Sequence, residues 1–200
     1  MAFRPVSVAF ALLLLSPVAA PAQFQSESYK FLDAVKNAKG DDVTAMLDKP
    51  GSRIVNTRDI SSGDTALHIV VRRADPLYTT YLLQKGADPQ VRNNKGDTPL
   101  TIAAQAGASN IVDLLVKGKA DLNYPNSAGE TALILAVHRR DADMVRQLLA
   151  AGADPDQADR LAGQSARAYA QNDPRNTLIA RIIAETPKAP KRAVAGPKLR

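Results

Sequence analysis

The chain has 200 residues, 45% of them hydrophobic, which is enough to bury the core of one ordinary domain. It contains no cysteine, which excludes disulfide bonds, thiolate metal sites, a cysteine nucleophile and lipid attachment through cysteine. Its formal net charge of +6 comes from the two ends: without Arg4 and the five cations after residue 186, the 26 basic residues fall to 20, which equals the 20 acidic ones. A neutral body argues against nucleic acid as the partner, because phosphate backbones are bound by an excess of cations.

Residues 1–22 have the features of a secretory signal peptide. Arg4 precedes an apolar stretch at 6–15 that is too short to anchor in a bilayer, and Ala20-Pro21-Ala22 supplies small residues for a signal peptidase. A buried N-terminal helix is the alternative, but the order of charged, apolar and small residues favours a signal peptide. We expect cleavage after Ala22, a short lead at 23–28, and a periplasmic or secreted protein.

A glycine recurs along the chain at spacings of 33, 33 and 34 residues, at Gly63, Gly96, Gly129 and Gly163. Two residues after each glycine comes a hydroxyl side chain that can cap the first turn of an apolar helix: Thr65, Thr98, Thr131 and Ser165. Gly-Ala-Asp or Lys-Ala-Asp recurs in step at 86–88, 119–121 and 152–154. This period is typical of stacked-repeat proteins, which mostly present binding surfaces.

Each repeat reads as a short inner helix, an outer helix with apolar residues at helical spacing, and a polar turn that we call a finger. Gly86 and Gly152 are expected to end outer helices in the left-handed conformation. Lys119 stands at that position in the middle repeat, which leaves open a one-residue shift of the break there.

Three further departures from the repeat are expected to change local structure. Ala74 and Arg140 stand where Gly107 marks the turn between two helices, so those turns should be tight or strained. One extra residue in each of the turns 57–62 and 157–162 should lengthen those two fingers.

Thr-Ala-Leu-His at 65–68, Thr-Pro-Leu at 98–100 and Leu-Leu-Ala-Ala-Gly-Ala-Asp at 148–154 resemble the ankyrin repeat. That family's unit is a β-turn followed by two antiparallel helices. The resemblance covers 29–185 and implies an all-α solenoid of stacked repeats at about 59–91, 92–124 and 125–157. Capping repeats are expected at 29–51 and 159–185. In the last one, Arg167 stands where the repeats have Leu67, Leu100 and Leu133, as expected of an outermost face.

The residues that could carry chemistry have structural explanations. The resemblance implies that His68 and Thr65 hydrogen-bond within and between repeats. Asp88, Asp121 and Asp154 recur once per repeat, which argues for closing a turn through hydrogen bonds to the backbone. Asp154, Asp156 and Asp159 lack the spacing of a calcium loop. The sequence has no zinc-protease, nucleophile-elbow or phosphate-loop motif, so we expect no enzyme, no metal and no cofactor. A small hydrolase on a repeat frame is the remaining enzymatic alternative.

In ankyrin stacks the fingers and the exposed side of the inner helices form a continuous surface, which we call the concave face. The resemblance therefore implies binding of another, folded protein there. Tyr124, Arg72 and Arg92 are the strongest single candidates, because Tyr and Arg often dominate binding energy. Ile60 and Leu161 would lie at fingertips. The full predicted set is Arg58, Arg72, Arg73, Arg92, Asn93, Gln105, Tyr124, Asn126, His138 and Arg139.

Two explanations of the basic residues stay open. His138, Arg139 and the pair Arg72-Arg73 stand near the ends of inner helices, where cations are stabilised by the helix dipole. Alternatively they form a basic strip for an acidic partner surface.

The tail 186–200 has three prolines, five cations and no acid, so we expect it to be disordered. The leading hypothesis is an exported, monomeric, non-enzymatic interaction module that acts as scaffold, assembly factor or inhibitor. The alternative is a protein that associates with the anionic envelope surface through this tail.

Overall fold

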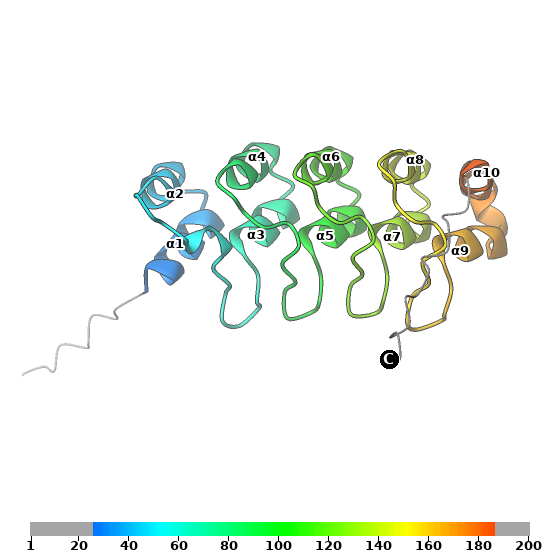
Figure 1. Ribbon diagram of the computed structural model, residues 1–200, viewed down its shortest axis with the longest axis horizontal. Helices are drawn as coiled ribbons and strands as arrows, with labels where there is room; N and C mark the ends of the chain where they lie inside the picture. Colours follow the sequence, from blue (N-terminus) through cyan, green and yellow to red (C-terminus); the bar gives the residue numbers. More distant parts are fainter. Residues whose placement is uncertain (1–25, 187–200) are drawn as a thin grey trace, which may run out of the picture.

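The computed structural model describes residues 26–186, which form a single row of stacked helix pairs (Figure 1). The inner helices are α1 (Glu27–Lys36), α3 (Ala66–Arg72), α5 (Pro99–Ala106), α7 (Ala132–His138) and α9 (Ala166–Asn172). The outer helices are α2 (Gly40–Leu47), α4 (Pro76–Gln84), α6 (Ser109–Lys117), α8 (Ala142–Ala150) and α10 (Thr177–Glu185). Two short 3-10 turns cover Ile54–Asn56 and Pro174–Asn176. The all-α solenoid predicted from the repeats is confirmed.

The inner helices begin where the hydroxyl residues predict. Thr98 Oγ1 accepts from Thr101 N at 3.2 Å, and Thr131 Oγ1 accepts from Ile134 N at 3.3 Å. Ser165 caps α9 in the same way through Ala168 N. Each hydroxyl satisfies an amide that the first helical turn leaves without a partner.

The outer helices end in the left-handed conformation, with φ of 85° at Gly86 and 98° at Gly152. Lys119 adopts the same conformation with φ of 62°, so the chain breaks at the same position in every repeat. The one-residue shift left open by the sequence does not occur. Ala74 and Arg140 also have positive φ (53° and 59°), which confirms the expected strain in the turns between helices.

The core lies between the two helix layers and continues from repeat to repeat, because each inner helix packs on its neighbours and on its own outer helix. Leu67, Leu100 and Leu133 are buried at equivalent positions in it. Arg167, at this position in the last repeat, is not the solvated residue that an outermost face suggests. Its side chain is only 12% exposed, pairs with Asp156 at 2.7 Å and donates to the Ile183 carbonyl at 2.7 Å.

The two ends of the stack are single helix pairs. The first helix starts at Glu27, capped by Ser26, two residues before the predicted bound of 29. None of the helices between residues 26 and 186 is long and apolar enough to cross a membrane. The predicted signal peptide and the tail beyond Thr186 lie outside the described residues.

Candidate functional site

Four fingers project from the inner helices on the side away from the outer helices (Figure 1). Each is closed at its base by a backbone hydrogen bond, such as Asp59 N to Asp64 O at 2.8 Å and Asn93 N to Asp97 O at 3.0 Å. These bonds delimit fingers at 59–64, 93–97, 126–130 and 159–164. The first and last are one residue longer than the middle two, as the sequence predicts.

A short polar side chain at the base of each finger holds the turn together. Asn93 Oδ1 accepts from the amides of Lys95 and Asp97, and Asn126 Oδ1 accepts from those of Ala128 and Glu130. Asp59 and Asp159 accept backbone amides in the same way. Asn93 is only 6% exposed, so its predicted place on the partner-binding surface is wrong. The recurrence of Asp or Asn at this position was the signal for a turn-supporting role.

Neighbouring fingers are tied to one another through their backbones. Asn94 N donates to Ser62 O and Arg160 N donates to Ala128 O, each at 2.9 Å. Two glycines permit this approach, because a Cβ at Gly63 would lie 2.7 Å from Asn94 N and one at Gly129 would lie 2.4 Å from Arg160 N. Both glycines also have positive φ. The first finger is therefore fixed to the second, and the third to the fourth.

Arg58, Arg73 and Arg139 also link repeats, each by donating to a backbone carbonyl of an adjacent repeat. Arg58 Nη2 donates to the Arg92 carbonyl at 2.8 Å, and Arg139 Nη1 donates to the Gln105 carbonyl at 3.0 Å. Arg73 Nη1 donates to the Val35 carbonyl at 3.0 Å. Two of these carbonyls lie in the last turn of a helix, where no amide of the same helix is available.

The other two residues of the predicted basic strip face carboxylates. Arg72 makes a bidentate pair with Asp64, with contacts of 2.8 and 3.2 Å. His138 Nδ1 lies 3.4 Å from Glu130 Oε1, and the ring packs edge-to-face on Tyr169. Because Asp64 and Glu130 lie directly against Arg72 and His138, this part of the concave face is not a basic strip.

These interactions shift the pKa values of the carboxylates. Burial raises the pKa of Asp64, but hydrogen bonds from Arg72 and Asn93 outweigh it and bring the pKa below its usual value. At the last finger, the hydroxyl of Tyr169 donates to Asp159. This bond lowers the pKa of Asp159 and raises that of Tyr169 to about 12. Both carboxylates are therefore ionised at neutral pH.

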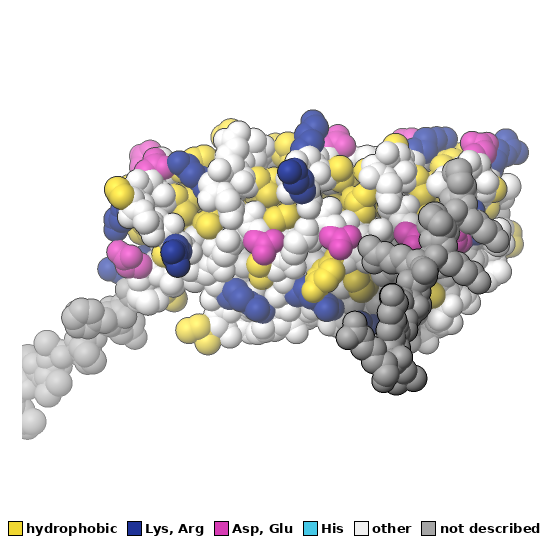
Figure 2. Space-filling view, viewed as in Figure 1, with side chains coloured by type: hydrophobic (Ala, Val, Ile, Leu, Met, Phe, Trp, Pro, Cys, Tyr) yellow, Lys and Arg dark blue, Asp and Glu magenta, His cyan; other side chains and the backbone are white. Residues whose placement is uncertain are grey.

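A smaller set of predicted residues remains available to a partner. Tyr124 is 38% exposed, and the Arg92 guanidinium lies 5.5 Å from its ring centroid. Gln105 is exposed at the end of α5. The extra residues of the long fingers leave Ile60 fully exposed and Leu161 81% exposed. In the face shown in Figure 2, cationic side chains lie along the fingers beneath a row of acidic ones.

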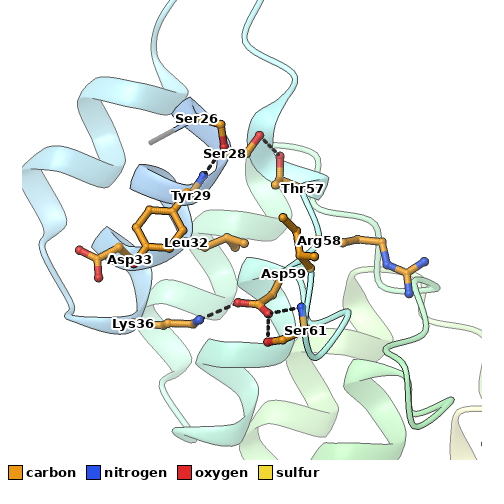
Figure 3. Close-up of a pocket in the computed structure, with 11 residues that line it drawn as sticks. Ser26, Ser28, Tyr29, Leu32, Asp33, Lys36, Thr57, Arg58, Asp59 and Ser61 are labelled. Atoms are coloured by element: carbon orange, nitrogen blue, oxygen red, sulfur yellow. Dashed lines mark hydrogen bonds and ion pairs between the residues drawn. The ribbon is translucent and has the colours of Figure 1, made fainter. Parts of the chain in front are cut away.

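A pocket of about 390 Å³ lies at the N-terminal end, between α1 and the first finger (Figure 3). Tyr29, Leu32 and Ile60 line it, together with the ion pair of Lys36 and Asp59 at 2.7 Å. Arg58 points away from it (Figure 3). The hydrogen bond from Lys36 is the main reason that the pKa of Asp59 is well below its usual value. Tyr29 is not among the residues that the sequence predicts for a binding surface, and that set contains no residue of α1.

His68 is buried and acts as predicted. Its Nδ1 accepts from Thr65 N at 3.1 Å, and its Nε2 lies 3.1 Å from the Asp97 carbonyl of the next repeat. A carbonyl can only accept, so Nε2 carries the proton. Asp88, Asp121 and Asp154 each accept the amide two residues ahead, which confirms their turn-closing role. In the described part of the chain, no group of three His, Asp or Glu side chains could hold a metal ion.

Comparison with known proteins agrees with this arrangement. No curated protein matches the sequence. A family model described as ankyrin repeats (3 copies) matches residues 31–126 and 67–159, which together cover more than half of the chain. The matched region contains three of the four fingers, the Thr65–His68 hydrogen bonds and the first four helix pairs. The chain therefore belongs to the ankyrin repeat family.

Proposed function

We propose that this protein is a non-enzymatic interaction module, exported to the periplasm, that binds a folded partner through its concave face. Ankyrin repeats generally mediate protein–protein interaction. A scaffold, an assembly factor and an inhibitor are all roles that such binding could serve. Export is inferred from the order of charged, apolar and small residues at 1–22.

The observation that carries the proposal is a row of hydrogen-bonded fingers with large apolar and aromatic side chains exposed on and beside them. Hydrogen bonds join the first finger to the second and the third to the fourth before any partner arrives, which reduces the entropy lost on binding. Ile60 and Leu161 are largely exposed on the two long fingers, and Tyr124, just before the third finger, is 38% exposed. Burying them against a partner would release that water and favour association.

Substitution of these three exposed side chains tests the proposal directly. In the triple variant Ile60→Ser, Tyr124→Ala and Leu161→Ser, we expect partner affinity to fall at least about tenfold, because exposed aromatic and apolar anchors carry much of the energy of an interface. Thermal stability should stay the same, since none of the three side chains is buried. Leu77→Ser is the control, because Leu77 is exposed to nearly the same extent as Leu161 (76% against 81%) but lies on the outer helix α4. Equal loss of affinity in the control would contradict a concave-face site.

The partner itself can be identified by affinity purification from the native envelope fraction. Residues 23–200 and a version ending at Glu185 would be tagged and compared by mass spectrometry of what each retains. One protein held in stoichiometric amounts by both, and lost by the triple variant, supports the proposal. Retention by the longer form alone, reversed by salt, would instead favour association with the envelope surface through the five cations of the tail.

A further inference from the structure

Across the concave face, the residue after the recurring finger glycine is set against the residue eight positions later, at the end of the inner helix. Asp64 pairs with Arg72 at 2.8 Å and Glu130 with His138 at 3.4 Å. In the last repeat, Asn172 Nδ2 donates to Gln164 Oε1 at 3.3 Å. In three of the four repeats, the side chain after the glycine thus has a polar partner at the end of the inner helix of the same repeat.

The second repeat breaks the pattern. Its pair of residues is Asp97 and Gln105, and no hydrogen bond joins their side chains. Asp64 has a second partner in Asn93 Nδ2 of the next finger, at 3.0 Å. The equivalent amide for Asp97 would be Asn126 Nδ2, but that group donates to Glu130 instead. Within residues 26–186, the Asp97 carboxylate therefore has no hydrogen bond and no ion pair.

Asp97 is nevertheless held in place by its backbone. Its amide donates to Asn93 Oδ1, and its carbonyl faces His68 Nε2. The side chain is half-buried, and burial is the main reason that its pKa is raised above the usual value. The nearby charges of Lys95, His68 and Arg72 act to lower this pKa without reversing the rise, and the charge of Asp64 adds to it. A half-buried carboxylate without a hydrogen-bond partner lowers the stability of the fold. The residues at the same position in the other repeats have partners and avoid this loss.

We propose that Asp97 and Gln105 form an acceptor site for a basic side chain, arginine or lysine, projecting from the partner protein into the middle of the concave face. This inference rests on the proposed function and adds the chemistry of the contact. A cation there would supply the partner that Arg72 supplies to Asp64. A guanidinium fits best, because its planar fork can donate to a carboxylate and to the Gln105 amide oxygen together. The partner surface is thus basic at this point, the opposite of the acidic surface that a basic strip would require.

A peptide probe tests the site without the natural partner. The chain 23–200, labelled with ¹⁵N, would be titrated with N-acetyl-Gly-Arg-Gly-amide and with the same peptide carrying norleucine. We expect saturable shifts of the Asp97 backbone and Gln105 side-chain amide signals with the arginine peptide only, and their loss in Asp97→Asn. Asp143→Asn is the control: it removes a carboxylate paired with Arg146 on the outer helix α8 and should not change the shifts. The absence of shifts, or equal shifts in Asp97→Asn, would overturn the inference.

The variant Gln105→Arg places a guanidinium of the protein itself at the proposed site. By analogy with Arg72, the new guanidinium should pair with Asp97, lower its pKa in an NMR titration and raise the melting temperature. Peptide binding should fall at least tenfold although the protein is more stable, which a general loss of folding cannot produce. In the Asp97→Asn background, Gln105→Arg should not raise the melting temperature. Undiminished peptide binding by Gln105→Arg would contradict the proposed site.

Two comparisons separate this inference from the proposed function and from the tail. If the envelope partner is retained equally by wild type and Asp97→Asn, the inference fails and the proposed function stands. If no partner is retained but the peptide binds at Asp97, the proposed function fails and the acceptor chemistry stands. If the peptide binds only a chain that ends at Glu185, the tail's own cations occupy the site, and the assignment to a partner is overturned.

Discussion

Individual residues in this stack adopt backbone conformations that their side chains do not favour. Lys119 stands where two other repeats have glycine, yet it takes the same left-handed conformation with φ of 62°. The cost for an L-residue is about 1–2 kcal/mol. The repeat imposes this cost, because the Ala120 amide must reach the Leu115 carbonyl to close the end of α6. Ala38, Ala74 and Arg140 have positive φ for the same geometric reason.

Lys119→Gly should therefore raise the free energy of unfolding by about 0.5–1 kcal/mol, after subtraction of the extra chain entropy of glycine in the unfolded state. Urea denaturation with the midpoint and slope fitted together would measure it. Lys117→Gly, at the last residue of α6, is the control and should lower stability by up to about 1 kcal/mol. Stabilisation by both, or by neither, would show that the left-handed strain is not the cause.

At the scale of elements, one side chain adds polar bonds to the packing of the last outer helix against α8 and α9. The Arg167 guanidinium reaches from α9 to the Ile183 carbonyl in α10 and to Asp156 in the preceding loop. It thereby satisfies a carbonyl at the end of a helix and a carboxylate with a single group. A leucine at this position would follow the pattern of the other repeats, but within residues 26–186 no inner helix follows α9.

Arg167→Leu should lower stability by about 2 kcal/mol, because it removes the charged hydrogen bonds that Arg167 donates to Asp156 and to the Ile183 carbonyl. Hydrogen exchange should accelerate first in the amides of α10, with α3 and α5 protected as before, since repeats contact only their neighbours. Arg175→Leu is the control. Its pair with Asp173 is exposed, and such pairs contribute little. Uniform loss of protection along the stack would contradict a local role.

At the scale of the whole molecule, the charges determine how stability responds to acid. Burial lowers the pKa of His68, so the unfolded chain takes up a proton there first, and stability is lost as pH falls below about 6.5. The pKa values of Asp59, Asp64 and Asp159 are lowered, so they stabilise the fold above about pH 4 and that contribution is lost below it. Asp97 acts in the opposite direction, because its pKa is raised and its protonation relieves an unfavourable charge.

We therefore expect the melting temperature to fall in two steps on acidification, first below about pH 6.5 and again below about pH 4. His68→Gln should lower stability at pH 7 and remove the first step, since the glutamine side chain does not titrate. Asp59→Asn should reduce only the second step. A first step that persists in His68→Gln would assign it to another group, and scanning calorimetry across the pH range distinguishes these outcomes.

The sequence by itself determined the repeat architecture. The capping hydroxyls and the glycines or left-handed Lys119 after the outer helices act over a few residues and recur at the repeat period, so they predict the helix pairs and the two long fingers. The structural roles of His68 and of Asp88, Asp121 and Asp154 could be predicted for the same reason. The exposure of Ile60, Tyr124 and Leu161 could also be predicted from the sequence, because these residues lie at or beside turns.

Only the tertiary structure decided which polar residues of the concave face remain free. Asn93 is buried through its contact with Asp64, 29 residues away, and Arg139 is engaged by a carbonyl 34 residues away. The pairing of Arg72 and the missing partner of Asp97 depend on which of several nearby donors reaches which carboxylate. Sequence patterns record the type of residue at each position, but the choice of partner depends on side-chain reach between stacked repeats. For that reason the local sequence is enough to predict the fold, whereas contacts between stacked repeats determine which polar side chains of the concave face have partners.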